Sequence, residues 1–155
     1  MEKIKNVMIG IEGKTGAMID EKAPGAGVAL GVVALKTLGD HFVAQTGLEG
    51  SYFHPAATHL HGKGPLGAFL GVGVYKLFDD MAFMATVNAR SGYDFSRDKP
   101  FAGAELGMRL MFELAGKDGI VNCYPFIGME GGYLWDDRHG GRALLTFGFM
   151  YDVAR

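Results

Sequence analysis

The sequence contains no long hydrophobic run, although almost half of it is apolar. Hydrophobic residues make up 48% of the 155 residues. Charged residues, polar residues or glycines interrupt every stretch of the roughly 18 apolar residues that a membrane-spanning helix needs. A helical membrane protein is therefore excluded, and the apolar residues belong to shorter elements.

Cysteine and net charge are also scarce. Cys123 is the only cysteine, which excludes an intrachain disulfide. The formal net charge is −2 and no basic stripe is present, so we expect no nucleic-acid partner. The N-terminal MEKIKNVMIG lacks an apolar core before a small-residue cleavage site. If the protein is exported, we expect its signal peptide to lie outside this sequence.

Glycine, in contrast, is abundant. The 25 glycines are more than twice the usual share of roughly 7%, and they lie within apolar stretches rather than in linkers. No low-complexity segment or break in composition divides the chain, so we expect a single domain over residues 1–155.

The stretch 101–113, FAGAELGMRLMFE, shows the pattern on which the whole chain is built. Every second residue from Ala102 is apolar, whereas the intervening set alternates glycine with charge, including Glu105 and Arg109. A period of two places the two sets on opposite faces of a β-strand. A helix would mix them, because residues three and four apart share a helical face.

Seven other stretches repeat this alternation. We predict strands over residues 4–14, 26–36, 42–53, 65–76, 81–92, 101–113, 123–135 and 143–151. Each has about the length of a tilted strand that crosses a bilayer. The predicted connections alternate between long and short, which is how outer-membrane barrels place long loops at one end and tight turns at the other.

The two faces decide which solvent surrounds the barrel. The apolar sets contain no charge as we assign them, and the opposite sets contain charged residues and many glycines. A soluble, lipocalin-like barrel would need the reverse arrangement, and eight strands leave too little interior space for all the large apolar side chains. Aromatic residues gather near the predicted strand ends, as expected at two membrane interfaces. They are Tyr52, Phe53, Tyr93, Tyr133 and Trp135 by the loops, and Phe42, Phe78, Phe83, Phe112 and Tyr151 by the turns.

Several phrases of the sequence resemble the small eight-stranded outer-membrane barrels, namely the transmembrane domain of outer-membrane protein A and the opacity and attachment proteins. These phrases are LGDHFVAQTGLEGSYF, LFDDMAFMATVNARSGY, YPFIGMEGGYLW and TFGFMY. The resemblance and the alternation together predict an all-β fold, an eight-stranded antiparallel up-and-down transmembrane β-barrel.

The charges of the inward sets are the strongest candidate site. They are Glu12, Lys14, Glu49, Arg90, Glu105, Arg109 and Glu130. Buried charges need partners and hydrogen bonds, so we expect an ion-paired plug that fills the lumen. A narrow ion path whose pairs exchange partners is the main alternative, and a catalytic carboxylate pair is a further one.

Other chemistry has weaker support in the sequence. His54, His59, His61 and His139 fall in two loops at one end and are weak metal candidates, because their spacing matches no closed metal motif. Ser91 and His54 share the outward phase, as a lipid A-modifying enzyme would require, but a strand separates them and no acidic residue is placed to orient the histidine. We expect no enzyme activity, no cofactor and an inert Cys123.

The sequence therefore predicts a monomeric protein of a bacterial outer membrane with a structural or surface-interaction role. Its expected partners are membrane lipids and lipopolysaccharide, together with an extracellular surface ligand bound through the long loops. The alternatives are a narrow ion-conducting pore and a lipid A-modifying enzyme.

Overall fold

All eight predicted strands are present in the computed structural model, which describes residues 7–20, 24–55, 65–95, 98–114, 123–135 and 140–153. The strands are β1 (Val7–Asp20), β2 (Pro24–Leu38), β3 (Phe42–Pro55), β4 (Pro65–Phe78), β5 (Met81–Asp94), β6 (Lys99–Phe112), β7 (Cys123–Trp135) and β8 (Gly140–Asp152). Among these residues no helix has the length and apolar character needed to cross a bilayer.

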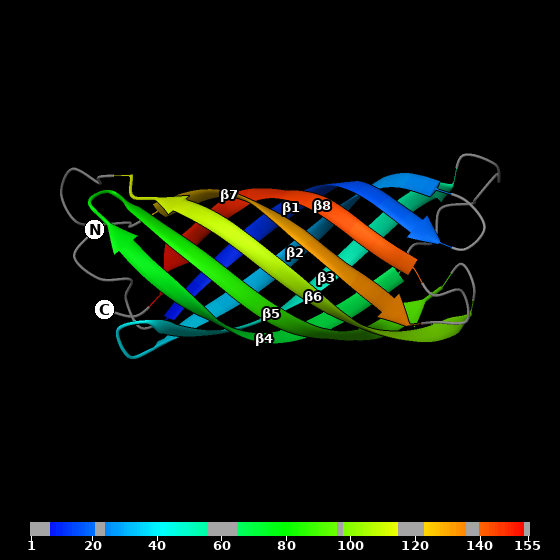
Figure 1. The fold of residues 1–155 in the computed structure, drawn as a ribbon, viewed down its shortest axis with the longest axis horizontal. Coiled ribbons are helices and arrows are strands. Elements are labelled where there is room, and N and C mark those ends of the chain that lie inside the picture. Colours follow the sequence, from blue (N-terminus) through cyan, green and yellow to red (C-terminus); the bar gives the residue numbers. More distant parts are fainter. Residues whose placement is uncertain are drawn as a thin grey trace.

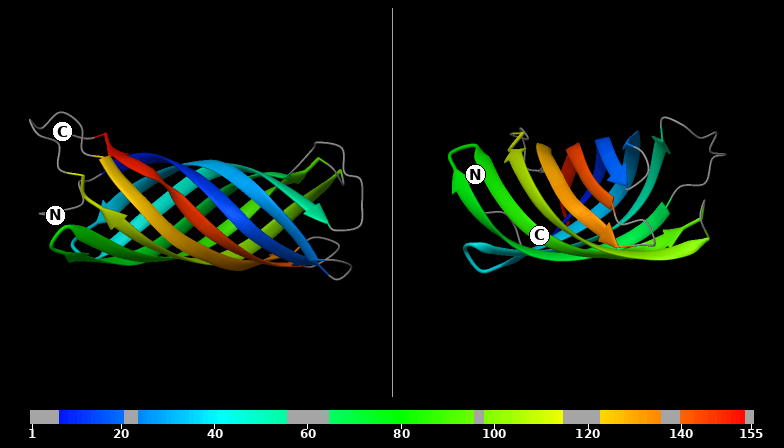
Figure 2. Two further views of the ribbon diagram at one scale, coloured as in Figure 1. Left: turned by 90° about the horizontal axis from the view of Figure 1, so that it is seen from above. Right: turned by 45° about the vertical axis from the view of Figure 1, so that its right-hand side comes forward.

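The strands form one closed antiparallel barrel. Each strand pairs with the next in sequence, and β8 pairs with β1 to close the sheet. Figures 1 and 2 show the result as an elongated barrel whose strands are strongly tilted against its long axis. Closure leaves no unpaired sheet edge, and it confirms the predicted up-and-down fold.

The strand register sets the width and tilt of the barrel. A path that starts at Leu38 of β2 and follows the paired residues through β3 to β8 and β1 returns to β2 at Val28, ten residues from its start. This stagger of ten residues over eight strands tilts the strands by roughly 40°. Inward-facing residues at the same height on two strands are therefore offset in register, which decides which interior side chains meet.

The strands reach further than the sequence predicted at the loop end. β1 continues to Asp20, so only residues 21–23 connect it to β2, and residues 95–98 connect β5 to β6. β8 begins at Gly140, within the stretch 136–142 that we assigned to a loop. Backbone pairing accounts for the difference, because the hydrogen bonds between strands need no apolar side chain. Residues 15–19 of β1, for example, pair with both β2 and β8. At the opposite end, residues 113–122 connect β6 and β7, and Leu114 bridges to Cys123.

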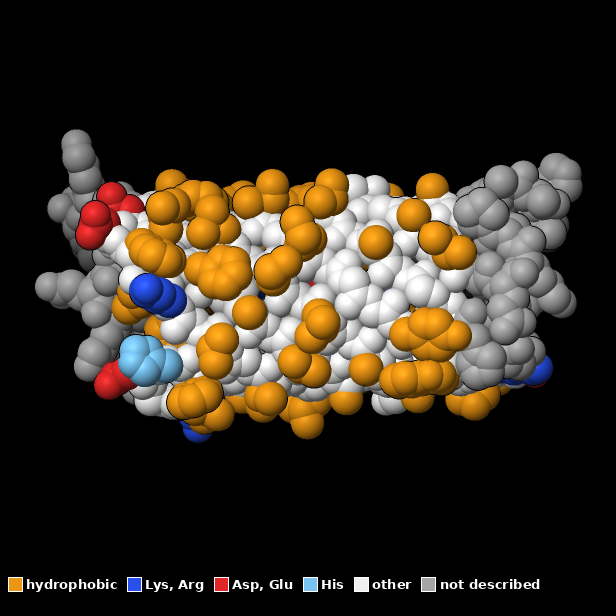
Figure 3. Space-filling view, in the orientation of Figure 1, with side chains coloured by type: hydrophobic (Ala, Val, Ile, Leu, Met, Phe, Trp, Pro, Cys, Tyr) orange, Lys and Arg blue, Asp and Glu red, His pale blue; other side chains and the backbone are white. Residues whose placement is uncertain are grey.

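The two faces are those predicted from the period of two. Large apolar side chains cover the outside, and several are among the most exposed residues, such as Leu30 at 71% and Leu70 at 67%. Figure 3 shows these side chains spread over the barrel wall. The expectation of an uncharged outer face was incomplete, because Lys36 and Lys76 also point outward near the turn end. A lysine is tolerated there because its long stem lets the ammonium group reach water.

Candidate functional site

The barrel interior holds a cluster of eight charged side chains, which we call the ion network. Its members are Glu12, Lys14, Glu49, Arg90, Glu105, Arg109, Glu130 and Arg142, and none is more than 5% exposed. Seven of them are the predicted interior charges. Arg142 is the eighth and was not predicted, because the stretch 136–142 was assigned to a loop. It lies two residues before Leu144 and four before Thr146, and all three are on the inward face of β8.

Glycine neighbours make room for these long side chains. Glu12 pairs with Gly31 of β2 and with Gly148 of β8, and Arg109 pairs with Gly128 of β7. A Cβ atom on Gly128 would lie 3.0 Å from Cγ of Arg109 and only 2.2 Å from a backbone oxygen. The alternation of glycine with charge in the sequence is thus a packing requirement of the lumen.

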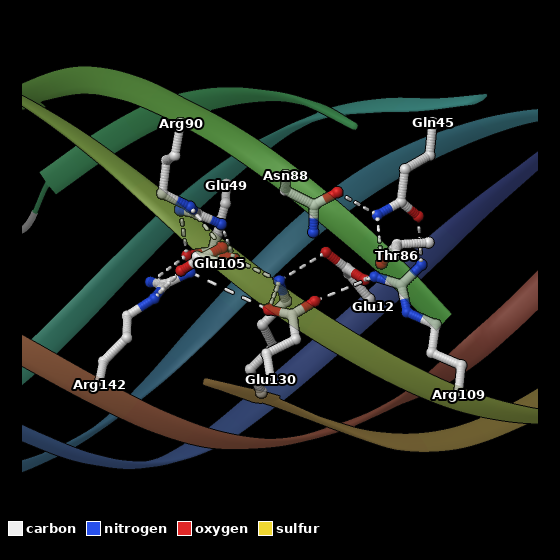
Figure 4. A network of polar contacts seen from close by, with 11 residues as sticks. Glu12, Gln45, Glu49, Thr86, Asn88, Arg90, Glu105, Arg109, Glu130 and Arg142 are labelled. Carbon is white, nitrogen blue, oxygen red and sulfur yellow. Dashed lines mark hydrogen bonds and ion pairs between the residues drawn. The ribbon is translucent and has the colours of Figure 1, made fainter. Parts of the chain in front are cut away.

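Lys14 of β1 contacts three of the four carboxylates of the network, which is drawn in Figure 4. Its Nζ atom is 2.9 Å from Oε1 of Glu12 and 2.7 Å from an oxygen of both Glu49 and Glu130. An ammonium group has three hydrogens to donate, so one lysine joins carboxylates from β1, β3 and β7. The ring of Phe69 lies 5.5 Å from the same Nζ atom and covers it from the side.

Two arginines complete the network on its loop side. Arg90 donates to both oxygens of Glu49 from its Nη atoms, at 2.7 and 2.8 Å, and to Glu105 from Nε at 2.9 Å. Arg142 donates to Glu49 from Nη1 at 3.0 Å and to Glu105 from Nε. Paired guanidinium and carboxylate groups form directional, charge-assisted bonds, so these contacts fix four strands against one another.

Arg109 extends the network toward the turn end. Its Nη2 atom is 2.7 Å from Glu12 and 3.1 Å from Glu130, and its Nη1 atom donates to Oε1 of Gln45 at 3.0 Å. Gln45 in turn donates to Asn88 at 2.6 Å. The chain of bonds therefore passes from charged to neutral side chains before the apolar part of the interior begins.

The charges in the network balance. Four carboxylates face one lysine and three arginines, so that the cluster is neutral as a whole. In a low-dielectric interior an uncompensated charge costs several kcal/mol, about 3–5 when one partner of a pair is removed. With Arg142 included, the interior avoids this cost.

A second layer closes the lumen between the ion network and the turn end. This apolar plug consists of Met8, Val33, Leu35, Val43, Tyr75, Ala82, Met84, Met111, Tyr124, Phe126 and Met150, and Phe69, which lies beside Lys14 and Arg90, joins the plug to the network. Its four methionines are fully buried, as suits a flexible side chain that fills irregular gaps. On the loop side of the network, Phe101 fills the space beside Gly67 and Gly92. Charged and apolar layers thus follow one another along the barrel axis.

The other predicted site residues are not brought together in the described part of the chain. His59, His61 and His139 lie outside the described residues, and only the backbone of His54 is described, where it pairs with Ala26. No group of three metal-binding side chains occurs among the residues that the structure describes. Ser91 is exposed on β5 and pairs with Ala68 of β4, which in turn pairs with Leu48 of β3. Ser91 is therefore two strands and several residues away from His54.

Comparison with known proteins supports the fold. No family model and no curated protein matches the chain. Among solved structures, it is similar to the crystal structure of neisserial surface protein A (NspA), with a TM-score of 0.56 and 13% sequence identity. The similarity covers 94% of this chain and 96% of NspA. At this low identity, what the two chains share is the fold of a small eight-stranded barrel.

Proposed function

We propose that this chain is an integral protein of a bacterial outer membrane, with a structural or surface-interaction role and a lumen that conducts no ions. The observation that carries the proposal is the inverted distribution of side chains. Exposed leucine, valine, isoleucine and phenylalanine cover the barrel wall, whereas eight charged side chains lie inside and only Lys36 and Lys76 face outward on the described strands. Exposure of such a wall to water is unfavourable, and its contact with lipid is favourable. Closure of the barrel also satisfies the hydrogen bonds of the backbone within a bilayer.

The fold shared with NspA, a neisserial surface protein, supports the location. The wall also supports the proposed lipid partners, phospholipid and lipopolysaccharide, since these molecules surround a barrel in an outer membrane. Binding of an extracellular ligand by the loops, and a monomeric state, belong to the same proposal.

The layered interior supports a closed barrel over a narrow pore. An ion path would need the ion pairs of Lys14, Arg90 and Arg109 to open, and it would also need the apolar plug to take up water. Apolar constrictions resist hydration and block ions. Opening of the network alone would therefore not produce a conducting state.

Conductance in planar lipid bilayers tests this proposal. The wild-type protein and the Arg109→Ala variant are each expected to give no ion current, because the plug of Met84, Met111 and Met150 is intact in both. Steady channels in the wild type, altered in conductance by Arg109→Ala, would contradict the closed lumen and establish the pore. Integrity of lipid A after co-expression of the wild type and Ser91→Ala tests the absence of enzyme activity, and deacylation lost in the variant would contradict it.

A further inference from the structure

The outward-facing lysines mark one end of the barrel. Lys36 of β2 and Lys76 of β4 are the only lysine or arginine residues at outward-facing positions of the described strands, and both lie near the turn end. In Figure 3 basic side chains are visible toward both ends of the barrel, and those at the turn end lie beside exposed apolar side chains of the wall. The described outward positions at the loop end carry no such residue, so the barrel wall is electrostatically asymmetric.

The two lysines lie at nearly the same height. Ala44 of β3 pairs with Lys36, and Val72 of β4 pairs with Ala44. The stagger of ten residues over eight strands moves the level position by about one residue for each strand, and hence from Val72 toward Lys76. Two strand spacings, measured around the tilted wall, separate the lysines by roughly 10–13 Å.

Neither ammonium group is engaged by a carboxylate in the part of the chain that the structure describes. Lys36 takes part in no ion pair there, and Lys76 contacts the ring of Phe78, with Nζ 5.4 Å from the ring centre. Of the described carboxylates at this end, Asp152 is at an inward position of β8, and Asp40, Asp79, Asp80 and Glu113 lie beyond the strand ends. The lysines are therefore nearer to the apolar band than Asp40, Asp79, Asp80 and Glu113.

The surface between the lysines is suited to acyl chains. The same stagger places Phe42 of β3 between the two lysines, and Phe42 is exposed, as are Val72 and Val74 of β4. These exposed side chains form an apolar surface that adjoins both lysines and continues toward the middle of the barrel. The phosphate of a lipid headgroup would thus meet two cations while its acyl chains lie against apolar side chains.

We propose that Lys36 and Lys76, with the apolar surface of Phe42, Val72 and Val74 beside them, form a binding site for one anionic phospholipid, and that the turn end accordingly faces the phospholipid leaflet. This inference rests on the proposed membrane location. Near a membrane surface each lysine contributes about 1 kcal/mol toward an anionic lipid, which is about fivefold in affinity for one lysine and about 25-fold for both.

Native mass spectrometry of the detergent-folded barrel tests the site. Phosphatidylglycerol and phosphatidylcholine with identical acyl chains are added separately, and the bound fraction of each is compared. The wild type is expected to bind one phosphatidylglycerol preferentially, and Lys36→Gln/Lys76→Gln is expected to lose the preference. Lys36→Arg/Lys76→Arg is expected to keep it, and the control Lys99→Gln removes a charge at the opposite end and is expected to change nothing.

Three results would overturn the proposal: equal binding of the two lipids by the wild type, an unchanged preference in the double glutamine variant, or an equal loss in Lys99→Gln. Insertion of the wild type into vesicles of pure phosphatidylcholine is measured in parallel. A barrel that inserts there but shows no lipid preference contradicts the site alone. A barrel that fails to insert into any vesicle contradicts the membrane location as well.

Discussion

Removal of Arg142 gives the sharpest test of the ion network. Its guanidinium group donates to Glu49 and Glu105, and all three side chains are at least 95% buried. Methionine at this position keeps most of the side-chain volume and removes the charge. The variant Arg142→Met therefore leaves the network with one more negative than positive charge.

The magnitude follows from the remaining partners. Breaking a buried ion pair costs about 3–5 kcal/mol. Glu49 keeps Lys14 and Arg90, and Glu105 keeps Arg90, which places the expected loss in the free energy of unfolding near the lower limit, about 3 kcal/mol. The control Lys36→Met removes the same charge from the outer wall, where Lys36 has no ion pair with a described residue, and in zwitterionic lipid it is expected to change stability by less than about 0.5 kcal/mol.

Urea unfolding in zwitterionic lipid vesicles measures both variants. Trp135 is the only tryptophan and lies exposed on the outer wall, so its fluorescence reports the transfer from lipid to water. The double variant Arg142→Met/Glu105→Gln restores neutrality. Its destabilisation is expected to fall short of the sum of the two single effects by roughly 1–3 kcal/mol.

Two results would refute this reasoning. A loss in Arg142→Met no larger than that of the Lys36→Met control would mean that water solvates the interior charges. Strict additivity in the double variant would mean that Arg142 and Glu105 do not interact in the folded barrel.

Three further variants test the packing of the barrel. Gly132→Ala places a Cβ atom 2.5 Å from Cγ of Glu105 and is expected to lower the free energy of unfolding by about 1–3 kcal/mol, the usual cost of overpacking. The neighbouring variant Gly131→Ala places its Cβ atom near only one atom, at 3.8 Å, and is expected to be neutral in the same urea assay. Leu30→Arg, on the outer wall, is expected to lose about 2–4 kcal/mol in vesicles; an unchanged midpoint would contradict lipid contact there. Met84→Ala is expected to lose about 2–5 kcal/mol in the free energy of unfolding, because it leaves a cavity in the apolar plug. A loss below about 1 kcal/mol would mean that the plug is loosely packed or hydrated.

The sequence predicts the two faces of the barrel because the pleat of a strand ties side-chain direction to residue parity. Glu12 and Glu130 point inward for the same reason that Leu30 points outward. Strand ends were harder to predict, since backbone pairing continues past the apolar residues. This is why Arg142, preceded by two glycines, was assigned to a loop.

A charge count could have identified Arg142. The seven predicted interior charges comprise four carboxylates and three cations, and a buried carboxylate without a partner is costly. Arg142 stands two positions before Leu144, which the alternation already placed inside. Neutrality of the lumen, applied as a criterion, would have extended the last strand to include it.

The pairing within the network was beyond the reach of the sequence. Lys14 meets Glu49 and Glu130, from strands on either side of β1, because the barrel closes with a stagger of ten residues, and no local pattern encodes that stagger. The same is true of the apolar plug. Met8, Met84, Met111 and Met150 alternate correctly along their own strands, but only the register shows that they lie in one layer.

Folding in the presence and absence of an amphiphile tests the central claim, that the apolar face of this barrel points outward into lipid. The protein is refolded from urea into detergent micelles, into lipid vesicles and into plain buffer, and boiled and unboiled samples are compared by gel mobility and circular dichroism. We expect β-type dichroism and a heat-dependent mobility shift only when micelles or vesicles are present. A chain that folds and remains soluble in plain buffer would contradict the assignment of the faces.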